Sequence, residues 1–164
     1  MNKQEILEEI EKTKEHLANM KKMLEECEYE RWKPEKGEMF YYLNSYNIAI
    51  AETWDASYSD AEHYNIYNCF HTREQAETEA ENILIRRQLE NIARRLNKRE
   101  KPDWIKCYQK KYYLGYTPIN SRITLECTTT TIAQGTVYCL DKSFLDVAIK
   151  EVGEELLKTY LRGE

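Results

Sequence analysis

The first pattern along the chain is a regular apolar repeat within residues 3–28. Apolar side chains and one threonine recur at alternating steps of four and three residues, at Ile6, Ile10, Thr13, Leu17, Met20, Leu24 and Cys27. This spacing is typical of a coiled-coil seam, and Glu and Lys occupy nearly all the other positions. A lone helix of this length is marginal in water, so the seam must pack either on the rest of the chain or on a second copy. We favour self-association through Ile6, Ile10, Leu17, Met20 and Leu24.

The next stretch has the alternating pattern of β-strands. The helix is expected to end before Pro34, and apolar residues then alternate in 38–44 and 47–54, around a short turn. This pattern predicts a β-hairpin. Residues 55–63 are rich in Asp, Ser and Glu and predict a loop, and residues 64–70 predict a third strand.

A long helix is predicted over residues 72–98. Thr72 and Gln75 have the spacing of a capping box, in which each side chain accepts from the other residue's backbone amide. One side of the helix carries Ala76, Ala80 and Ile83, and the nearly opposite side carries Ile85, Leu89, Ile92 and Leu96. The apolar face therefore switches near Leu84, which predicts that the two halves of this helix pack on different surfaces.

The remaining chain repeats the order of strands followed by a helix. Residues 105–116, 122–131 and 136–140 predict strands. A final helix is expected from Asp141 or Ser143, the latter with Asp146 as its capping-box partner, along an apolar stripe of Leu145, Ile149, Val152, Leu156 and Tyr160.

The two halves also share residues at an offset of 71 or 72 positions. The matching pairs are Trp32 and Trp104, Tyr41-Tyr42-Leu43 and Tyr112-Tyr113-Leu114, Tyr67 and Tyr138, and Ala76 and Ala148. We expect an internal repeat, with chance recurrence of a Tyr-rich strand as the competing explanation. The predicted fold class is α+β: an N-terminal coiled-coil helix (1–31) followed by two similar antiparallel-sheet-plus-helix (βββα) units, 32–100 and 101–164.

Composition narrows the function classes. The 164 residues contain no apolar run of the length that a membrane span needs, and the polar N-terminus lacks a signal-peptide core, so we expect a cytoplasmic protein. The net charge is only −5, but residues 86–111 hold ten Lys/Arg against three Asp/Glu. Such a basic segment is typical of a solvated face or a self-association surface and, less often, of an anion site.

Candidate chemistry is sparse. Five scattered cysteines without a CxxC pair indicate reduced thiols, and three histidines lack metal-ligand spacing, so no metal or other cofactor is expected. No nucleophile-elbow, zinc-protease or phosphate-loop motif is present, which argues against an enzyme. The 13 tyrosines against three phenylalanines instead favour a binding protein, because Tyr supplies both a stacking ring and a hydroxyl.

Several motifs resemble a family of small phage and prophage proteins of Gram-positive bacteria. They are Trp32-Lys-Pro-Glu-Lys-Gly-Glu38 with Tyr41-Tyr42, then Trp54, Asn68-Cys-Phe70 and Thr72-Arg-Glu-Gln-Ala-Glu77, and later Gly135-Thr-Val-Tyr138 and Phe144 to Glu155. Family members read W-x-P-x-x-G-E-x-Y-Y and, further on, F-x-T-x-E-E-A-E. The resemblance implies a phage accessory protein, a class that includes many inhibitors of bacterial immunity, and it implies no catalytic residues.

Three binding functions follow. The first is an oligomeric inhibitor that docks on a host defence effector such as a CRISPR nuclease; the second is a sponge that sequesters a cyclic nucleotide immune signal. The third is single-stranded nucleic-acid binding, which the overall acidity weakens. A pocket with Arg beside an aromatic cage would favour the sponge, and a flat aromatic face would favour the inhibitor. The candidate partner-binding or ligand-binding residues are Trp54, Tyr42, Tyr64, Arg86, Arg87, Arg94 and Arg95.

Overall fold

The computed structural model of this protein describes residues 13–14 and 31–163. The chain divides into two compact units, residues 1–34 and 35–164. The second unit contains, in chain order, β1 (Met39–Leu43), β2 (Ala49–Thr53), α2 (Tyr58–Asn65), α3 (Arg73–Leu96), β3 (Lys111–Thr117), the 3-10 turn η1 (Pro118–Asn120), β4 (Arg122–Thr128), α4 (Phe144–Val152) and α5 (Glu154–Arg162). The predicted α+β class is confirmed. The predicted seam residues Ile6, Ile10, Leu17, Met20 and Leu24 lie outside the described residues, so self-association stays a prediction.

The first hairpin forms where the alternating pattern predicts it. Strands β1 and β2 pair antiparallel, from Met39 opposite Thr53 to Leu43 opposite Ala49. Beyond this pair, the Asn68 side chain accepts from the Leu43 amide and donates to the Leu43 carbonyl, both at 2.7 Å. Asn68 thus satisfies the open edge of β1 as a neighbouring strand would.

The predicted loop and third strand are wrong, because residues Tyr58–Asn65 form α2. Ser57 caps this helix: its hydroxyl accepts from the Asp60 amide, and the Asp60 carboxylate accepts from the Ser57 amide. This second capping box lies in the sequence but is not followed by a clear apolar stripe, so the pattern of polar residues resembles a loop. Only Phe70 pairs with β1, through an isolated bridge to Tyr41, so no third strand forms.

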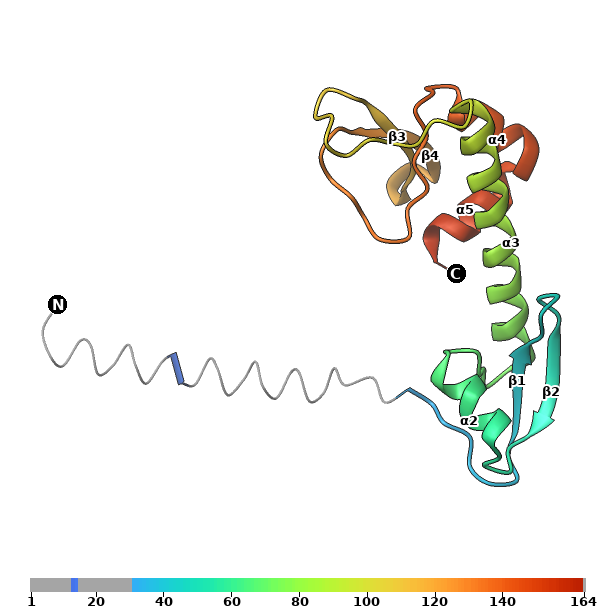
Figure 1. Cartoon of the computed structure of the whole chain (residues 1–164). Helices are drawn as coiled ribbons and strands as arrows, with labels where there is room; N and C mark the ends of the chain where they lie inside the picture. Colours follow the sequence, from blue (N-terminus) through green and yellow to red (C-terminus); the bar gives the residue numbers. More distant parts are fainter. Residues whose placement is uncertain (1–12, 15–30, 164) are drawn as a thin grey trace, which may run out of the picture. The chain divides into compact units, whose positions relative to one another are not determined.

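Helix α3 begins and packs as predicted. Thr72 and Gln75 form the reciprocal capping box. Ala76 is buried near the start of the helix, whereas Ile85 and Leu89 are buried in a core shared with α4 and α5. Leu84, at the switch, is 54% exposed. One continuous helix therefore contacts β1 and β2 with one face and α4 and α5 with another (Figure 1).

The second hairpin is shorter than predicted. Strands β3 and β4 pair from Lys111 opposite Thr128 to Thr117 opposite Arg122. Residues 103–110 form a loop instead of the start of a strand, because side chains bond its backbone: the Gln109 side chain accepts from the Asp103 amide at 2.7 Å. The predicted strand 136–140 is reduced to one bridge between Cys139 and Tyr112. The order hairpin, single bridge and helix occurs twice in the described residues, and the third strand predicted for each unit is absent from both.

The final helix is broken in two at Gly153, whose φ of +101° and ψ of 140° only glycine readily adopts. The break displaces the predicted stripe, because Leu157 is buried while Leu156 is 43% exposed. The predicted capping box at Ser143 does not form; the Asp141 carboxylate accepts from the Ser143 amide at 2.8 Å instead. Among the described residues, no helix combines the length and apolar character needed to cross a membrane.

Candidate functional site

A pocket of about 460 Å³ lies where the C-terminal end of α3 meets the segments before β3 and before α4. We call it the Trp104 pocket. Its walls are Glu90, Ala93, Arg94, Asn97, Arg99, Glu100, Lys101, Pro102, Trp104, Thr136, Val137 and Tyr138. The pocket therefore combines two aromatic rings with three cationic side chains, within the size range of small-ligand sites.

The aromatic wall consists of Trp104 and Tyr138 in edge-to-face contact. Their ring centroids are 4.9 Å apart with an interplanar angle of 83°, and Tyr138 meets Tyr113 in the same manner at 5.5 Å. The Tyr138 hydroxyl also accepts a hydrogen bond from the Ala133 amide at 2.8 Å. Both the ring and the hydroxyl of Tyr138 are thus held in place by contacts within the protein.

Lys111 supports Trp104 from the protein interior. Its side chain has no exposed surface, and its ammonium donates to the backbone carbonyls of Lys106, Gln109 and Thr129 at 3.3, 3.0 and 3.1 Å. The same ammonium lies 4.9 Å from the centroid of the Trp104 ring. This cation–π contact fixes the indole against the loop that Lys111 holds together.

Asn97 forms the inner end of the pocket. Its side-chain oxygen accepts from the Leu140 amide at 2.7 Å and from the Cys139 thiol at 3.2 Å. Burial raises the pKa of the Cys139 thiol, which keeps it protonated and unreactive. These contacts tie the end of α3 to the segment that carries Tyr138.

The cations of the pocket are not neutralised by neighbouring carboxylates. Arg94, Arg99 and Lys101 form no ion pair within the described part of the chain, whereas Glu90 is paired with Arg86 at 3.2 Å. The remaining carboxylate of the wall is Glu100. The pocket therefore presents an excess of positive charge beside its aromatic wall.

A second hollow adjoins the first. This basic recess, of about 440 Å³, is lined by Asn91, Arg94, Arg95, Lys98 and Arg99. It shares Arg94 and Arg99 with the Trp104 pocket, so the same two side chains border both hollows. Arg95 is paired with Glu151 at 2.6 Å. A hydrogen bond from the Ser143 amide lowers the pKa of Asp141, and the positive charge of Lys98 adds a smaller part of that shift.

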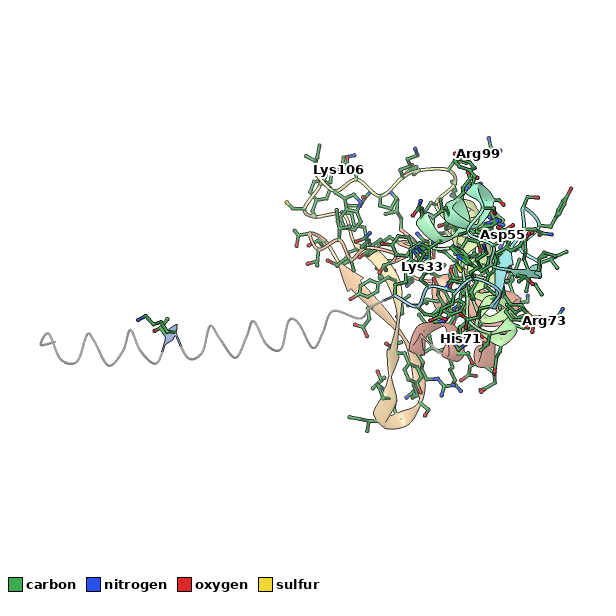
Figure 2. The ribbon with its side chains drawn as sticks, turned by 90° about the horizontal axis from the view of Figure 1, so that it is seen from below. Lys33, Asp55, His71, Arg73, Arg99 and Lys106 are labelled. Carbon is green, nitrogen blue, oxygen red and sulfur yellow. The ribbon has the colours of Figure 1, made fainter. Side chains whose placement is uncertain are left out.

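The backbone at the boundary of the two hollows is strained. Lys98 and Arg99 both have a left-handed backbone, with φ of +49° and +70°. The turn is closed by hydrogen bonds from the Arg99 amide to the Arg94 carbonyl at 3.1 Å and from the Glu100 amide to the Asn97 carbonyl at 2.8 Å. Left-handed backbone costs about 1 to 2 kcal/mol for a residue with a side chain, and glycine would avoid that cost. The turn instead presents two long cations, of which Arg99 is seen at the molecular surface in Figure 2.

The aromatic residues predicted from sequence as site residues lie around the first hairpin instead. Trp54 is 4% exposed, and its ring packs edge-on against Phe40 and Tyr64. Tyr42 is half-buried and stacks on His63 with centroids 4.0 Å apart. These three rings contribute to packing in this arrangement and do not line the Trp104 pocket.

The predicted arginines divide into two groups. Arg94 and Arg95 lie at the end of α3 and line the hollows described above. Arg86 is paired with Glu90, and Arg87 is exposed on α3 outside both hollows. The structure thus brings two of the four predicted arginines to a common site.

The aromatic partners of those arginines were not predicted as site residues. Trp104 and Tyr138 come from two separate segments after α3. Two signals point to them in the sequence: Trp104 closely follows the basic run that ends at Lys101, and each belongs to a matched pair in the predicted repeat. Neither signal indicates that the two rings meet.

The structure contains another hollow of about 260 Å³, lined by Leu89, Leu114, Gln134, Gly135, Thr136, Val137, Phe144, Tyr160 and Leu161. Its lining carries no charged side chain, so it lacks the groups that recognise an anion. Among the described residues, no group of three or more His, Cys, Asp or Glu side chains is placed to hold a metal ion.

The described residues form an α+β fold with a basic, aromatic-walled pocket. Comparison of the chain with protein-family models, with curated proteins and with solved structures found no match. The function is therefore argued from the site itself.

Proposed function

We propose that this protein is a non-enzymatic binding protein that holds a nucleotide in the Trp104 pocket. The observation that carries the proposal is the juxtaposition of Arg94 and Arg99, which form no ion pair with any described residue, with the rings of Trp104 and Tyr138. A nucleobase packs on aromatic rings, and a phosphate accepts hydrogen bonds from guanidinium groups.

The expected energies are large enough for useful affinity. Base contact with an aromatic side chain contributes about 1 to 3 kcal/mol, and a hydrogen bond to a charged group contributes about 1.5 to 3 kcal/mol. One base and one phosphate bound to two arginines would offset a substantial part of the entropy cost of association. Because Tyr138 and Trp104 are held by other contacts, little ordering is needed when the ligand binds.

The basic character of the pocket has a competing explanation. Cations at the C-terminus of a helix are stabilised by the helix dipole, and Arg94 and Arg95 lie in the last turn of α3. The dipole does not explain why Arg99, which lines the pocket, occupies a left-handed position in which glycine would be less strained. A ligand that needs the Arg99 charge explains this position.

The biological setting comes from the sequence resemblance. A phage accessory protein in the bacterial cytosol that binds nucleotides without converting them would act as a sponge, lowering the concentration of a cyclic nucleotide immune signal. This role requires binding alone and is compatible with the absence of recognised catalytic motifs in the chain.

The test is binding of defined nucleotides to the full-length protein. Adenosine 5′-monophosphate, guanosine 5′-monophosphate, 3′,5′-cyclic AMP and cyclic di-AMP are titrated by calorimetry and by thermal shift. Protein from a host lysate is separately heat-denatured, and released small molecules are identified by mass spectrometry. Binding of at least one nucleotide with a raised melting temperature is expected.

Matched variants localise the site. R94Q is expected to weaken binding about tenfold or more through loss of a charge-assisted bond, and W104L to weaken it about fivefold or more. R87Q removes an exposed arginine from the same helix, outside both hollows, and should bind as the unmodified protein does. The proposal is wrong if none of the nucleotides binds, or if R94Q and W104L bind as tightly as R87Q.

A second candidate function is inhibition of a host defence effector, such as a CRISPR nuclease, by direct contact. It is favoured by a group of exposed apolar and aromatic side chains near the first hairpin and α2: Tyr46, Ile48, Tyr58, Ile66 and Tyr67. The three tyrosines are at least 76% exposed, and exposed aromatic residues are enriched in protein interfaces.

This candidate is tested in a purified cleavage assay. The protein is added to a host CRISPR nuclease with its guide and target, and cleavage is measured with the unmodified chain and with a Y58S/Y67S double variant. Inhibition that the double variant abolishes would support this function. Undiminished cleavage at saturating protein, with no complex in size-exclusion chromatography, would rule out that effector.

A further inference from the structure

The basic recess has no role in a site that binds one base and one phosphate. It is about as large as the Trp104 pocket, at about 440 Å³ against about 460 Å³, and of its lining residues only Arg94 and Arg99 also line that pocket. Its lining contains no aromatic ring, only four cationic side chains and Asn91. A second base would find no stacking partner there, whereas a second phosphate would find several donors.

We propose that the ligand spans both hollows and carries two phosphate groups, with its base against Trp104 and Tyr138. This inference rests on the proposed nucleotide-binding function and deepens it. Arg94 and Arg99, which line both hollows, hold the first phosphate, and Lys98 with Asn91 receives the second.

The charges in the recess favour this assignment. Arg95 is paired with the Glu151 carboxylate at 2.6 Å, so its guanidinium is less available to a phosphate than the ammonium of Lys98. Lys98 forms no ion pair within the described residues, although the charge of Asp141 acts on it. Its left-handed backbone directs the chain into the turn that also carries Arg99. Lys98 and Arg99 thus combine a left-handed backbone with the lack of an ion pair among the described residues, and each is assigned to a different phosphate.

The inference separates two sets of residues by their effect. Lys98 lines only the recess, and Trp104 lines only the pocket. A change at Lys98 should therefore weaken a two-phosphate ligand selectively, while a change at Trp104 should weaken one-phosphate and two-phosphate ligands alike.

The experiment compares AMP, ADP, the linear dinucleotide pApA and cyclic di-AMP on the full chain at one fixed low salt concentration. ADP, or one of the dinucleotides, is expected to bind about tenfold or more tightly than AMP, as an added charge-assisted contact provides. ADP against pApA distinguishes a nucleoside diphosphate from a dinucleotide. In K98Q, the affinity of the two-phosphate ligand should exceed that of AMP by about threefold or less, while the affinity for AMP is unchanged. W104L should weaken the binding of all four ligands.

Three results would overturn the inference. If AMP binds as tightly as every two-phosphate ligand, the recess is not part of the site, and the proposed nucleotide binding still stands. If none of the four ligands binds, the inference fails, and the proposed function fails with it when guanosine 5′-monophosphate and 3′,5′-cyclic AMP also do not bind. If a ten-nucleotide single strand, titrated under the same conditions, binds more tightly than pApA, the partner is single-stranded nucleic acid instead of a small ligand with two phosphates.

Discussion

Lys111 provides a sharp test of how the loop beneath the Trp104 pocket is held. A fully buried lysine commonly pairs with a carboxylate, but this ammonium is surrounded by three backbone carbonyls and an indole ring. The informative substitution is Lys111→Met, which keeps an unbranched side chain of similar length and removes the charge and all three donors.

The size of the effect follows from the three acceptors. A buried carbonyl that loses its donor costs about 1 to 3 kcal/mol, but those of Lys106 and Gln109 belong to a largely exposed loop, where water can replace the ammonium. Removing a buried charge also recovers part of its desolvation energy. We therefore expect Lys111→Met to lower the free energy of unfolding by about 2 kcal/mol, well below the sum for three unsatisfied groups.

The assay is urea denaturation followed by tryptophan fluorescence, with Lys110→Met as the control. Lys110 is the exposed neighbour of Lys111, so both variants change the net charge equally, and the control should differ from the unmodified protein by less than about 0.5 kcal/mol. Folded Lys111→Met should also show altered emission, because its ammonium lies 4.9 Å from the Trp104 ring. If Lys111→Met is as stable as Lys110→Met, the buried ammonium makes no net contribution and our account of the loop is incorrect.

Four further predictions concern the rest of the chain. Asn68→Ala removes two hydrogen bonds of 2.7 Å to Leu43 and should cost about 2 kcal/mol in urea denaturation. Asn68→Asp keeps the acceptor but sets a carboxylate oxygen against the Leu43 carbonyl, so it should cost at least as much, and equal stability of all three proteins would contradict the strand-like role of Asn68. Gly153→Ala should destabilise by about 1 kcal/mol or more, since φ is +101° at the break between α4 and α5, and an unchanged thermal midpoint would refute this. The pKa of Asp141 is lowered from its usual 3.8, mainly by the hydrogen bond from the Ser143 amide. The ionised carboxylate therefore stabilises the fold above pH 3.8, and this contribution is lost as the pH falls through the lower native pKa. Between about pH 5 and about pH 2, the melting temperature of Asp141→Asn should therefore fall less than that of the unmodified protein. Deleting residues 3–28 should reduce the mass in solution to that of a monomer by light scattering, and an unchanged subunit number would exclude the predicted N-terminal coiled coil.

Elements whose signals are local could be predicted from the sequence alone. The hairpin of β1 and β2 follows from period-two alternation, and the start of α3 follows from Thr72 and Gln75. The switch of the buried face near Leu84 could also be predicted, because the direction of a side chain on a helix depends only on its position along the helix. Each of these features depends on residues that lie close together in one segment of the chain.

Features that depend on weak or competing local signals were missed. Helix α2 has eight residues and no clear apolar stripe, so its capping box was the sole indication of it. Residues 64–70 and 136–140 have strand-like composition, yet each forms only one bridge, at Phe70 and at Cys139. Whether an apolar run extends a sheet depends on what its neighbours offer as hydrogen-bond partners, and Asn68 takes that role for β1.

The candidate site, in contrast, arises from tertiary contacts. The sequence marked Arg94 and Arg95 as cations without indicating a partner, and it marked Trp104 and Tyr138 as repeated aromatics without indicating a ligand. Their meeting at the end of α3 depends on contacts between segments that are distant along the chain, including the bridge at Cys139 and the Asn97 hydrogen bond to Leu140. Local periodicity sets which way a side chain faces on its own element; which other element it then meets is set by packing of the whole unit.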